Sequence, residues 1–224
     1  MGEEEEEDDD VCKVVLLGET GVGKTCIISR FINNTFEEGL MSTNGAAYAN
    51  KTATFPEYGD KTINFEIWDT AGQEKYRALN QIFYKDASIC ILVYDITREP
   101  TFKVLQEYWY QQVKENGPKN IILGLAGNKC DLFEKEQVNE EEARAFAKEI
   151  NAIFEPTSAA KNEGIDDLFH HLGCKFIEPN YQVDDSEIKD KRKKSGKDKR
   201  GASQKKIKLG DNKSQGNDKQ KKCC

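Results

Sequence analysis

Short apolar runs and helix-like periodic segments alternate along residues 11–178 of the 224-residue chain. Nearly continuous apolar runs predict buried strands, and they lie at 11–17, 89–94, 121–126 and 152–155. Segments 48–55 and 62–68 instead alternate apolar and polar residues, and Pro56 to Asp60 separate them. This arrangement predicts an antiparallel hairpin.

Apolar residues recur at helical spacing in further segments, which predict helices at 24–33, 101–115, 140–150 and 164–177. Alternation of strands with helices is typical of an α/β fold, in which helices cover both faces of a parallel sheet. We therefore expect an α/β fold with a six-stranded, mostly parallel sheet. The hairpin supplies its one antiparallel edge strand.

Charge divides the chain into three parts. Residues 3–10 are all acidic, whereas residues 186–222 contain 15 Lys+Arg against 5 Asp+Glu, within a chain of net charge −7. The basic segment has almost no apolar residues, so it cannot offset the entropy cost of ordering. We expect an acidic disordered head over 1–10, one folded domain over 11–178 and a disordered basic tail over 179–224. The acidic body argues against a nucleic-acid partner, and the basic tail favours a membrane surface.

The remaining composition excludes several classes of protein. The chain has no apolar run long enough to span a membrane, and the start MGEEEEEDDD resembles neither a secretory signal nor a myristoylation site. Five of the seven cysteines are scattered among apolar residues, which predicts buried free thiols in a reducing compartment. The only histidines, His170 and His171, are expected at the surface, and no zinc-ligand pattern is apparent.

The strongest chemical motif is GETGVGKT, at 18–25, which lies between a predicted strand and a predicted helix. It fits the pattern G-x-x-x-x-G-K-[ST], in which loop N–H groups surround a phosphate. We expect the loop backbone to contact phosphate, its residues being Gly18, Thr20, Gly21, Val22 and Gly23. Lys24 would place its charge on the β- and γ-phosphates, and the Thr25 hydroxyl would bind Mg²⁺.

Two further motifs narrow the nucleotide to guanine. Asn128-Lys129-Cys130-Asp131 fits N-K-x-D, in which the aspartate accepts hydrogen bonds from guanine N1–H and its exocyclic amine. Adenine lacks donors there, which opposes an ATP-binding alternative. Asp69-Thr70-Ala71-Gly72-Gln73 fits D-x-x-G-Q. There Asp69 would hold Mg²⁺ through water, the Gly72 N–H would meet the γ-phosphate, and Gln73 would orient the attacking water.

With these motifs the sequence resembles a GTPase of the Ras superfamily, and the Rab family in particular. IWDTAGQE at 67–74, LVYDIT at 92–97 and the terminal Cys-Cys are Rab-like, while STNGAAY at 42–48 and FEIW at 65–68 resemble the early-endosome Rabs. The resemblance implies a P-loop GTPase fold and a GTP/GDP switch in vesicle traffic, on the endocytic route. It also implies an exchange factor, a GTPase-activating protein, a GDP-dissociation inhibitor and effectors.

The same resemblance assigns further roles. Thr43 would bind Mg²⁺ and the γ-phosphate. Without the family resemblance, the surrounding residues favour an ordinary loop threonine. Phe36 would pack edge-on against guanine rather than in the core. Cys26, Ser158 and Ala159 would complete the nucleotide site, with the Ala159 N–H reaching guanine O6. The aromatic residues Tyr48, Trp68 and Phe83 would contact effectors, or equally would only pack the two switch segments, Thr35–Tyr48 and Asp69–Tyr84. The chain departs from the family at Thr20, Asn44 and Ala160.

The chain ends in Cys223-Cys224 after a lysine-rich linker. A C-a-a-X signal would need a cysteine where Lys221 stands, whereas a Rab-type end implies a prenyl group on each thiol. Two lipid chains anchor a protein stably and one only marginally. The expected location is the cytoplasmic face of an intracellular membrane, an endosome in particular, with a cytosolic pool.

Two functions remain open on the sequence. The first is a membrane-anchored switch that hydrolyses GTP slowly, which Thr43, Gly72 and Gln73 favour. The alternative is a GTP-bound Rab-like adaptor that is catalytically silent, for which Thr20 and Asn44 would be responsible.

Overall fold

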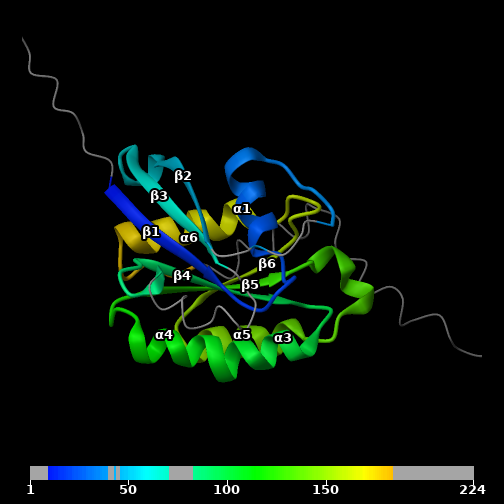
Figure 1. The fold of residues 1–224 in the computed structure, drawn as a ribbon. Coiled ribbons are helices and arrows are strands. Elements are labelled where there is room, and N and C mark those ends of the chain that lie inside the picture. Colours follow the sequence, from blue (N-terminus) through cyan, green and yellow to red (C-terminus); the bar gives the residue numbers. More distant parts are fainter. Residues whose placement is uncertain (1–9, 40–42, 44–45, 71–82, 184–224) are drawn as a thin grey trace, which may run out of the picture. The chain divides into compact units, whose positions relative to one another are not determined.

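The computed structural model describes residues 10–39, 43, 46–70 and 83–183. Its centre is a six-stranded sheet of strand order β2-β3-β1-β4-β5-β6 (Figure 1). The strands are β1 (Asp10–Leu17), β2 (Ala46–Phe55), β3 (Lys61–Thr70), β4 (Ile89–Asp95), β5 (Ile122–Asn128) and β6 (Ile153–Thr157). Only β2 and β3 pair antiparallel, so the structure confirms the predicted α/β sheet with one antiparallel edge strand.

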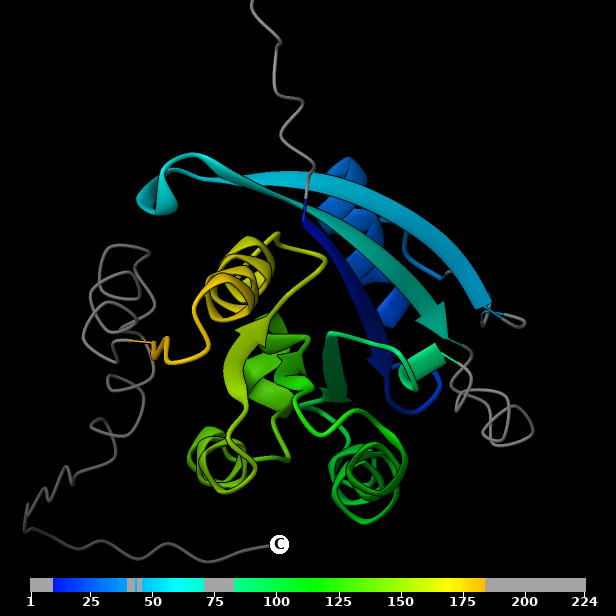
Figure 2. The same ribbon diagram turned by 90° about the vertical axis from the view of Figure 1, so that its left-hand side faces the viewer.

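Helices cover both faces of the sheet (Figure 2). On one face lie α1 (Lys24–Asn33) and α6 (Ile165–Ile177), and on the other lie α3 (Glu99–Val104), α4 (Tyr110–Asn116) and α5 (Glu140–Glu149). Local sequence sets their ends. Asn139 caps α5, because its side chain accepts from the Glu141 N–H at 2.8 Å, and Asn34 ends α1 in the left-handed conformation.

The core follows the apolar pattern of the sequence. Every residue of β4 is buried, as expected of a central parallel strand. Four phenylalanines gather beneath α1 and α6, with Phe31 stacked on Phe169 at 3.7 Å and Phe65 edge-on to both at 5.9 Å. Phe55 joins them from the end of β2. This aromatic cluster fixes the two helices against the sheet.

The elements differ from the expected ones in two places. The predicted helix 101–115 runs from Glu99 to Asn116 and contains a π-helical turn, η3 (Leu105–Trp109), between α3 and α4. The extra residue of a π turn is invisible to a 3.6-residue periodicity. Strand β3 also continues through Asp69, which had been expected after the strand. Its register there pairs Asp69 with Leu16 of β1 and so fixes that carboxylate beside the loop that follows β1.

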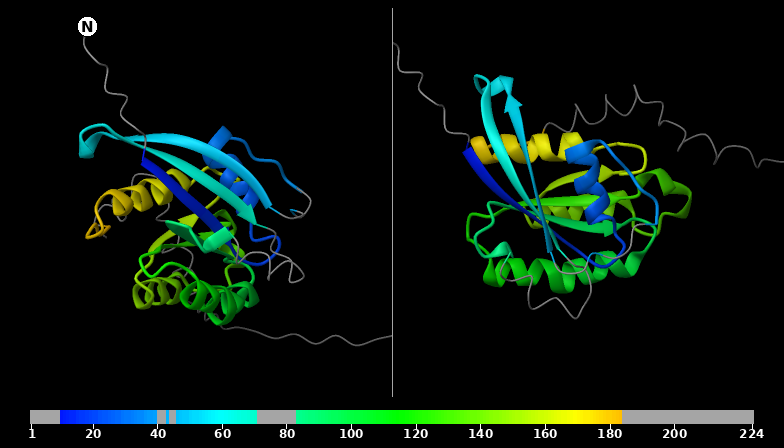
Figure 3. Two further views of the ribbon diagram at one scale, coloured as in Figure 1. Left: turned by 60° about the vertical axis from the view of Figure 1, so that its left-hand side comes forward. Right: turned by 45° about the horizontal axis from the view of Figure 1, so that its top comes forward.

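Strands β2 and β3 form a long hairpin closed by the short helix η1 (Pro56–Tyr58). Figure 3 shows this turn at the same end of the molecule as the C-terminal end of α6. The opposite end of the hairpin reaches Thr70, next to the loop that joins β1 to α1. Among the described residues, no helix is both long and apolar enough to cross a bilayer.

Candidate nucleotide-binding site

The loop between β1 and α1 requires glycine at two positions. Gly23 has φ +99°, and a Cβ there would lie 2.2 Å from Nδ2 of Asn128. Gly18 has φ +152°, and its Cβ would lie 2.2 Å from the carbonyl oxygen of Val93. Any side chain at either position would push the loop away from β4 and β5. The loop therefore lies close to β4 and β5 and places its backbone N–H groups, and the partial positive charge of the α1 N-terminus, at the C-terminal end of β1.

Lys24 begins α1 and is buried, with 5% of its surface exposed. Its ammonium group donates to the carbonyls of Gly18 at 2.8 Å and Glu19 at 3.2 Å. Burial lowers the pKa of Lys24 to about 8, against the opposing attraction of Asp69 and Glu19. The loop thus wraps a positive charge at its centre, where the motif predicts the β- and γ-phosphates.

Two hydroxyls and one carboxylate converge beside Lys24. The Thr25 hydroxyl donates to Oδ2 of Asp69 at 2.7 Å, and the Thr43 hydroxyl donates to the same oxygen at 3.2 Å. The two hydroxyl oxygens lie 2.8 Å apart. The second carboxylate oxygen of Asp69 is buried and has no hydrogen-bond partner within the described residues. Burial raises the pKa of Asp69, while Thr25 and Lys24 oppose the rise. A hard cation that prefers oxygen ligands, such as Mg²⁺, fits this set.

The N-K-x-D motif forms the opposite wall of the site. Asn128 ends β5 and donates to the Val22 carbonyl at 2.7 Å, and Lys129 donates to the Gly21 carbonyl at 2.9 Å. Both side chains therefore hold the phosphate loop from behind. Asp131 lies in the short helix η4 (Cys130–Lys135) and accepts from the Ser158 hydroxyl at 2.6 Å. This contact orients the carboxylate that the motif assigns to guanine.

A buried carboxylate that the motif analysis missed supports this wall. Asp95 ends β4, is 1% exposed and pairs with Lys129 at 2.7 Å and Arg98 at 3.1 Å. Burial alone would raise the pKa of Asp95, but hydrogen bonds from Lys129 and Thr97 outweigh it and hold the pKa below its usual value. Arg98 also donates to the Thr20 carbonyl at 3.1 Å. The sequence signals were that Asp95 belongs to the Rab-like stretch LVYDIT at 92–97 and directly follows an all-apolar strand.

These walls enclose a cavity of about 450 Å³, a size suited to a small ligand. Most of the predicted nucleotide-site residues line it, namely Thr20, Gly21, Gly23, Lys24, Thr25, Cys26, Phe36, Thr43, Asn128, Lys129, Asp131 and Ala159. Cys26 was expected to be buried, but it is only half-buried. The lining also includes Thr70, Leu132 and Ala160. Four other predicted site residues do not line the cavity but contact residues that do, namely Gly18, Val22, Asp69 and Ser158. Gly72 and Gln73 fall outside the described residues.

Comparison with known proteins agrees with this geometry. The Ras family profile matches residues 13–178. Human Ras-related protein Rab-22A is 44% identical over 157 residues, which are 70% of this chain and 79% of that protein. The chain belongs to the Ras family, among its Rab proteins. Human Rab-31 is 37% identical over 179 residues (79% of this chain and 90% of that protein). Rab5A of Oryza sativa subsp. japonica is 40% identical over 166 residues (74% and 80%).

Membership of this family makes the chain a GTPase and confirms the resemblance to the early-endosome Rabs. In this Rab protein the three aromatic residues expected to read effectors do lie in one cluster. Tyr48 contacts Trp68 at 5.4 Å between ring centroids, and Trp68 contacts Phe83 at 5.3 Å. Tyr48 is 51% exposed at the start of β2. The cluster is thus open to solvent at one end and packed at the other.

Both histidines of this Rab domain were expected at the surface, but only one of them lies there. His171 is buried on α6, with Nδ1 3.2 Å from Oε1 of Glu155. His170 is exposed and lies near Glu57 and Cys174, so three side chains of metal-ligating type meet at this point of the described residues. Burial, followed by the hydrogen bond to Glu57, raises the pKa of Cys174 to about 12. Sequence could not reveal this group, because Glu57 lies 113 positions before His170.

Proposed function

We propose that this Rab protein is a membrane-anchored switch that binds GTP or GDP with Mg²⁺ and hydrolyses GTP slowly. It would act in endocytic vesicle traffic on the cytoplasmic face of an endosomal membrane, with a cytosolic pool. The GTPase domain would span 11–178, between the acidic head over 1–10 and the tail over 179–224 that carries prenyl groups on Cys223 and Cys224. The Rab relatives support this assignment.

The position of Thr43 is the observation that carries the proposal. Thr43 belongs to the segment between α1 and β2, yet its hydroxyl lies within hydrogen-bond distance of both Thr25 and Asp69. Loss of the γ-phosphate and of its contact to Mg²⁺ would release that threonine and the segment around it. The segment is therefore tied to the nucleotide state by the same oxygen cluster that fits the metal.

The residues around the phosphates would catalyse hydrolysis by positioning and charge, without a covalent intermediate. Thr25, Thr43 and, through water, Asp69 would hold Mg²⁺, which neutralises charge on the β- and γ-phosphates. Lys24 would turn from the loop carbonyls toward the developing charge on the bridging oxygen, because the phosphate outcompetes neutral acceptors. Gln73 would orient the attacking water. By analogy with Ras, unassisted turnover would be on the order of 10⁻⁴ s⁻¹.

The aromatic cluster is the proposed effector surface. Tyr48 lies on β2, five positions after Thr43, and Trp68 lies on β3, directly before Asp69 in the chain. Any movement of Thr43 or Asp69 would therefore reach Tyr48 and Trp68 through the backbone. Phe83 lies 5.3 Å from Trp68 between ring centroids. A movement of the second switch segment would therefore change the same surface.

Single-turnover phosphate release from GTP-loaded protein tests the catalytic part. Gln73→Leu keeps the size of the side chain but loses the groups that orient water, so hydrolysis should fall at least ~10-fold, about 1.4 kcal/mol of barrier. GTP affinity should stay the same. Gln111→Leu, on α4 and outside the cavity, is the matched control and should hydrolyse GTP like the wild type. A wild type that retains GTP without releasing phosphate would support the silent-adaptor alternative.

A further inference from the structure

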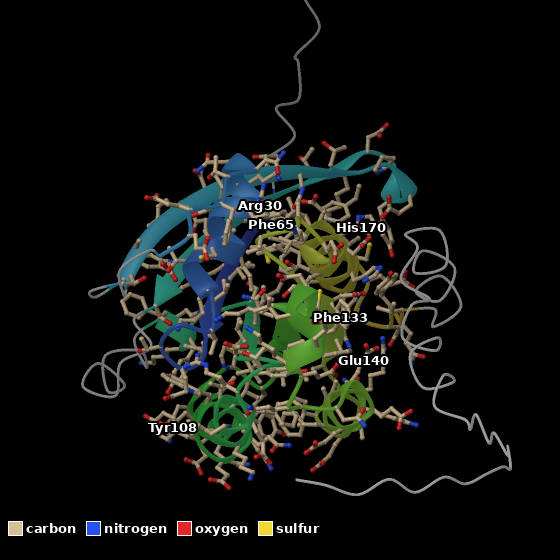
Figure 4. All side chains as sticks on the ribbon, turned by 90° about the vertical axis from the view of Figure 1, so that its right-hand side faces the viewer. Arg30, Phe65, Tyr108, Phe133, Glu140 and His170 are labelled. Atoms are coloured by element: carbon tan, nitrogen blue, oxygen red, sulfur yellow. The ribbon has the colours of Figure 1, made fainter. Side chains whose placement is uncertain are left out.

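Three metal-ligating side chains meet at the closed end of the β2–β3 hairpin, away from the nucleotide cavity. His170 Nε2 lies 3.1 Å from Oε1 of Glu57, and Cys174 Sγ lies 3.3 Å from the same oxygen. Cys174 Sγ and His170 Nε2 are 3.6 Å apart. All three ligand atoms therefore lie within one coordination sphere of each other. Figure 4 labels His170 on α6, beside the hairpin turn.

The fold brings these groups together through a close contact of helix and hairpin. A Cβ on Gly173 would lie 2.2 Å from the ring of Phe55, so the absence of a side chain allows α6 to touch the end of β2. Phe55 also stacks on the His170 ring at 5.5 Å. His170 and Cys174 are four residues apart and so share one face of α6. Glu57 extends from the turn η1 onto that face.

We propose that Glu57, His170 and Cys174 form a Zn²⁺ site that links the hairpin turn to α6, with water as the fourth ligand. Tetrahedral zinc with one sulfur, one nitrogen and one oxygen ligand separates those atoms by about 3.4–3.6 Å, given the usual bond lengths. The observed separations of 3.1, 3.3 and 3.6 Å lie within about 0.3 Å of these values, so small side-chain shifts suffice to form the site. On binding, the Cys174 thiol loses its proton to solvent and becomes a thiolate ligand.

The donor set selects the metal. Thiolate and imidazole favour Zn²⁺ over Mg²⁺, which takes oxygen ligands, so this site and the oxygen cluster of Thr25, Thr43 and Asp69 would hold different ions. Cys174 is buried whereas Glu57 and His170 are exposed, so the ion can enter from solvent and keep a water. Tyr58 and Glu178 border the site, joined by a hydrogen bond of 3.2 Å. The Glu178 carboxylate adds negative charge outside the ligand set.

A bound ion would restrain the hairpin. The turn at Glu57 is at the far end of the two strands whose other ends adjoin Thr43 and Asp69. Cross-linking this turn to α6 favours the folded state, because the unfolded chain does not hold the three ligands together. At a hundredfold excess of free Zn²⁺ over its Kd, the Tm should rise by about 5 °C or more.

Titration of the full chain, loaded with GDP and Mg²⁺, tests the site. Cys223→Ser and Cys224→Ser are introduced first, so that the terminal thiols cannot bind zinc. Calorimetry should then show one strong Zn²⁺ equivalent, and Co²⁺ should give a near-ultraviolet thiolate-to-metal absorption. Glu57→Gln, His170→Gln and Cys174→Ala should each weaken Zn²⁺ binding at least ~10-fold, and Cys174→Ala should remove the cobalt band.

Glu178→Gln is the matched control, because it removes a neighbouring carboxylate that is not a ligand, and its Zn²⁺ affinity should fall much less than that of any ligand variant. Glu57→Gln keeps the test valid if Cys174→Ala disturbs packing, since Glu57 lies on an exposed turn. The absence of a zinc equivalent, or equal affinity in the parent and in Glu57→Gln, would overturn the site. Either result leaves GDP binding unaffected and so remains separable from the proposed switch function.

Discussion

The phosphate loop shows which individual residues can be assigned from sequence. Gly18 and Gly23 were identifiable because a short motif dictates the local backbone, and the structure needs glycine at both for conformation and for space. The pair of Asp95 with Lys129 was not identifiable. Asp95 ends β4 and Lys129 follows β5, so only the strand order makes them neighbours, whereas Arg98 is only three residues from Asp95 in the chain. A short motif thus identifies the residues of the phosphate loop, whereas the pairs between strand ends that hold the loop in place depend on the order of the strands.

The close approach of Gly23 to Asn128 predicts a loss of nucleotide binding in Gly23→Ala. The new Cβ must displace Nδ2 of Asn128 from 2.2 Å, which disturbs the loop or the base-binding wall. We expect GDP affinity to fall at least ~30-fold, about 2 kcal/mol. Gly59→Ala is the control, because Gly59 also has a left-handed φ (+73°) but open space around it. Fluorescent GDP titration should show near-normal affinity in that control, and equal losses in both variants would refute the argument.

Asp131 predicts a change of base preference. Asp131→Asn keeps an oxygen that can accept from Ser158, so the local structure should survive. The new amide presents a donor where guanine also has donors, and GTP affinity should fall at least ~100-fold. Xanthine carries an oxygen in place of the guanine amine, so xanthosine triphosphate should bind better to the mutant than to the wild type. Competition titrations with GTP, xanthosine triphosphate and ATP measure this, and wild-type binding of ATP equal to that of GTP would contradict the assignment.

At the scale of elements, apolar periodicity predicted the strands and helices but not how closely they pack. Segments 24–33 and 164–177 were expected as helices and are α1 and α6. The contact of Gly173 with Phe55 was not predictable, because from the sequence a glycine inside a helix indicates only a lower helix propensity. The π turn at Leu105–Trp109 also escaped the pattern. Packing depth and helix register arise from side chains that are distant in sequence.

Gly173→Ala should therefore destabilise the protein although alanine favours helix. Its Cβ would meet the ring of Phe55, which is 1% exposed and cannot move outward. Overpacking costs about 1–3 kcal/mol, and a Cβ at 2.2 Å from a buried ring is a severe overlap, so we expect the cost to exceed the gain in helix propensity of ~1 kcal/mol. Thermal unfolding should show a Tm lowered by a few degrees. Adding Phe55→Leu should recover stability relative to Gly173→Ala alone, and a Gly173→Ala protein more stable than wild type would show that α6 has room to spare.

At the scale of the whole molecule, composition predicts a folded domain over 11–178 between an acidic head and a basic tail. The family profile covers residues 13–178, which agrees with the extent of the apolar pattern. The terminal Cys223-Cys224 lies beyond the matched residues and directly follows the segment 186–222, which has 15 Lys+Arg and few apolar residues.

The double variant Cys223→Ser with Cys224→Ser should make the protein wholly cytosolic and leave nucleotide binding intact, because the tail lies outside the matched domain. One remaining thiol would carry one lipid, a marginal anchor, so each single variant should be intermediate and exchange faster. Replacing the tail lysines with glutamine is the charge control. It should shift the distribution less, because each lysine adds at most ~1 kcal/mol near anionic lipid and the interspersed acids reduce that. Fractionation of cells expressing each variant decides the question. If the double serine variant still sediments with membranes while the lysine-poor variant does not, the anchor is electrostatic and prenylation is excluded as its cause.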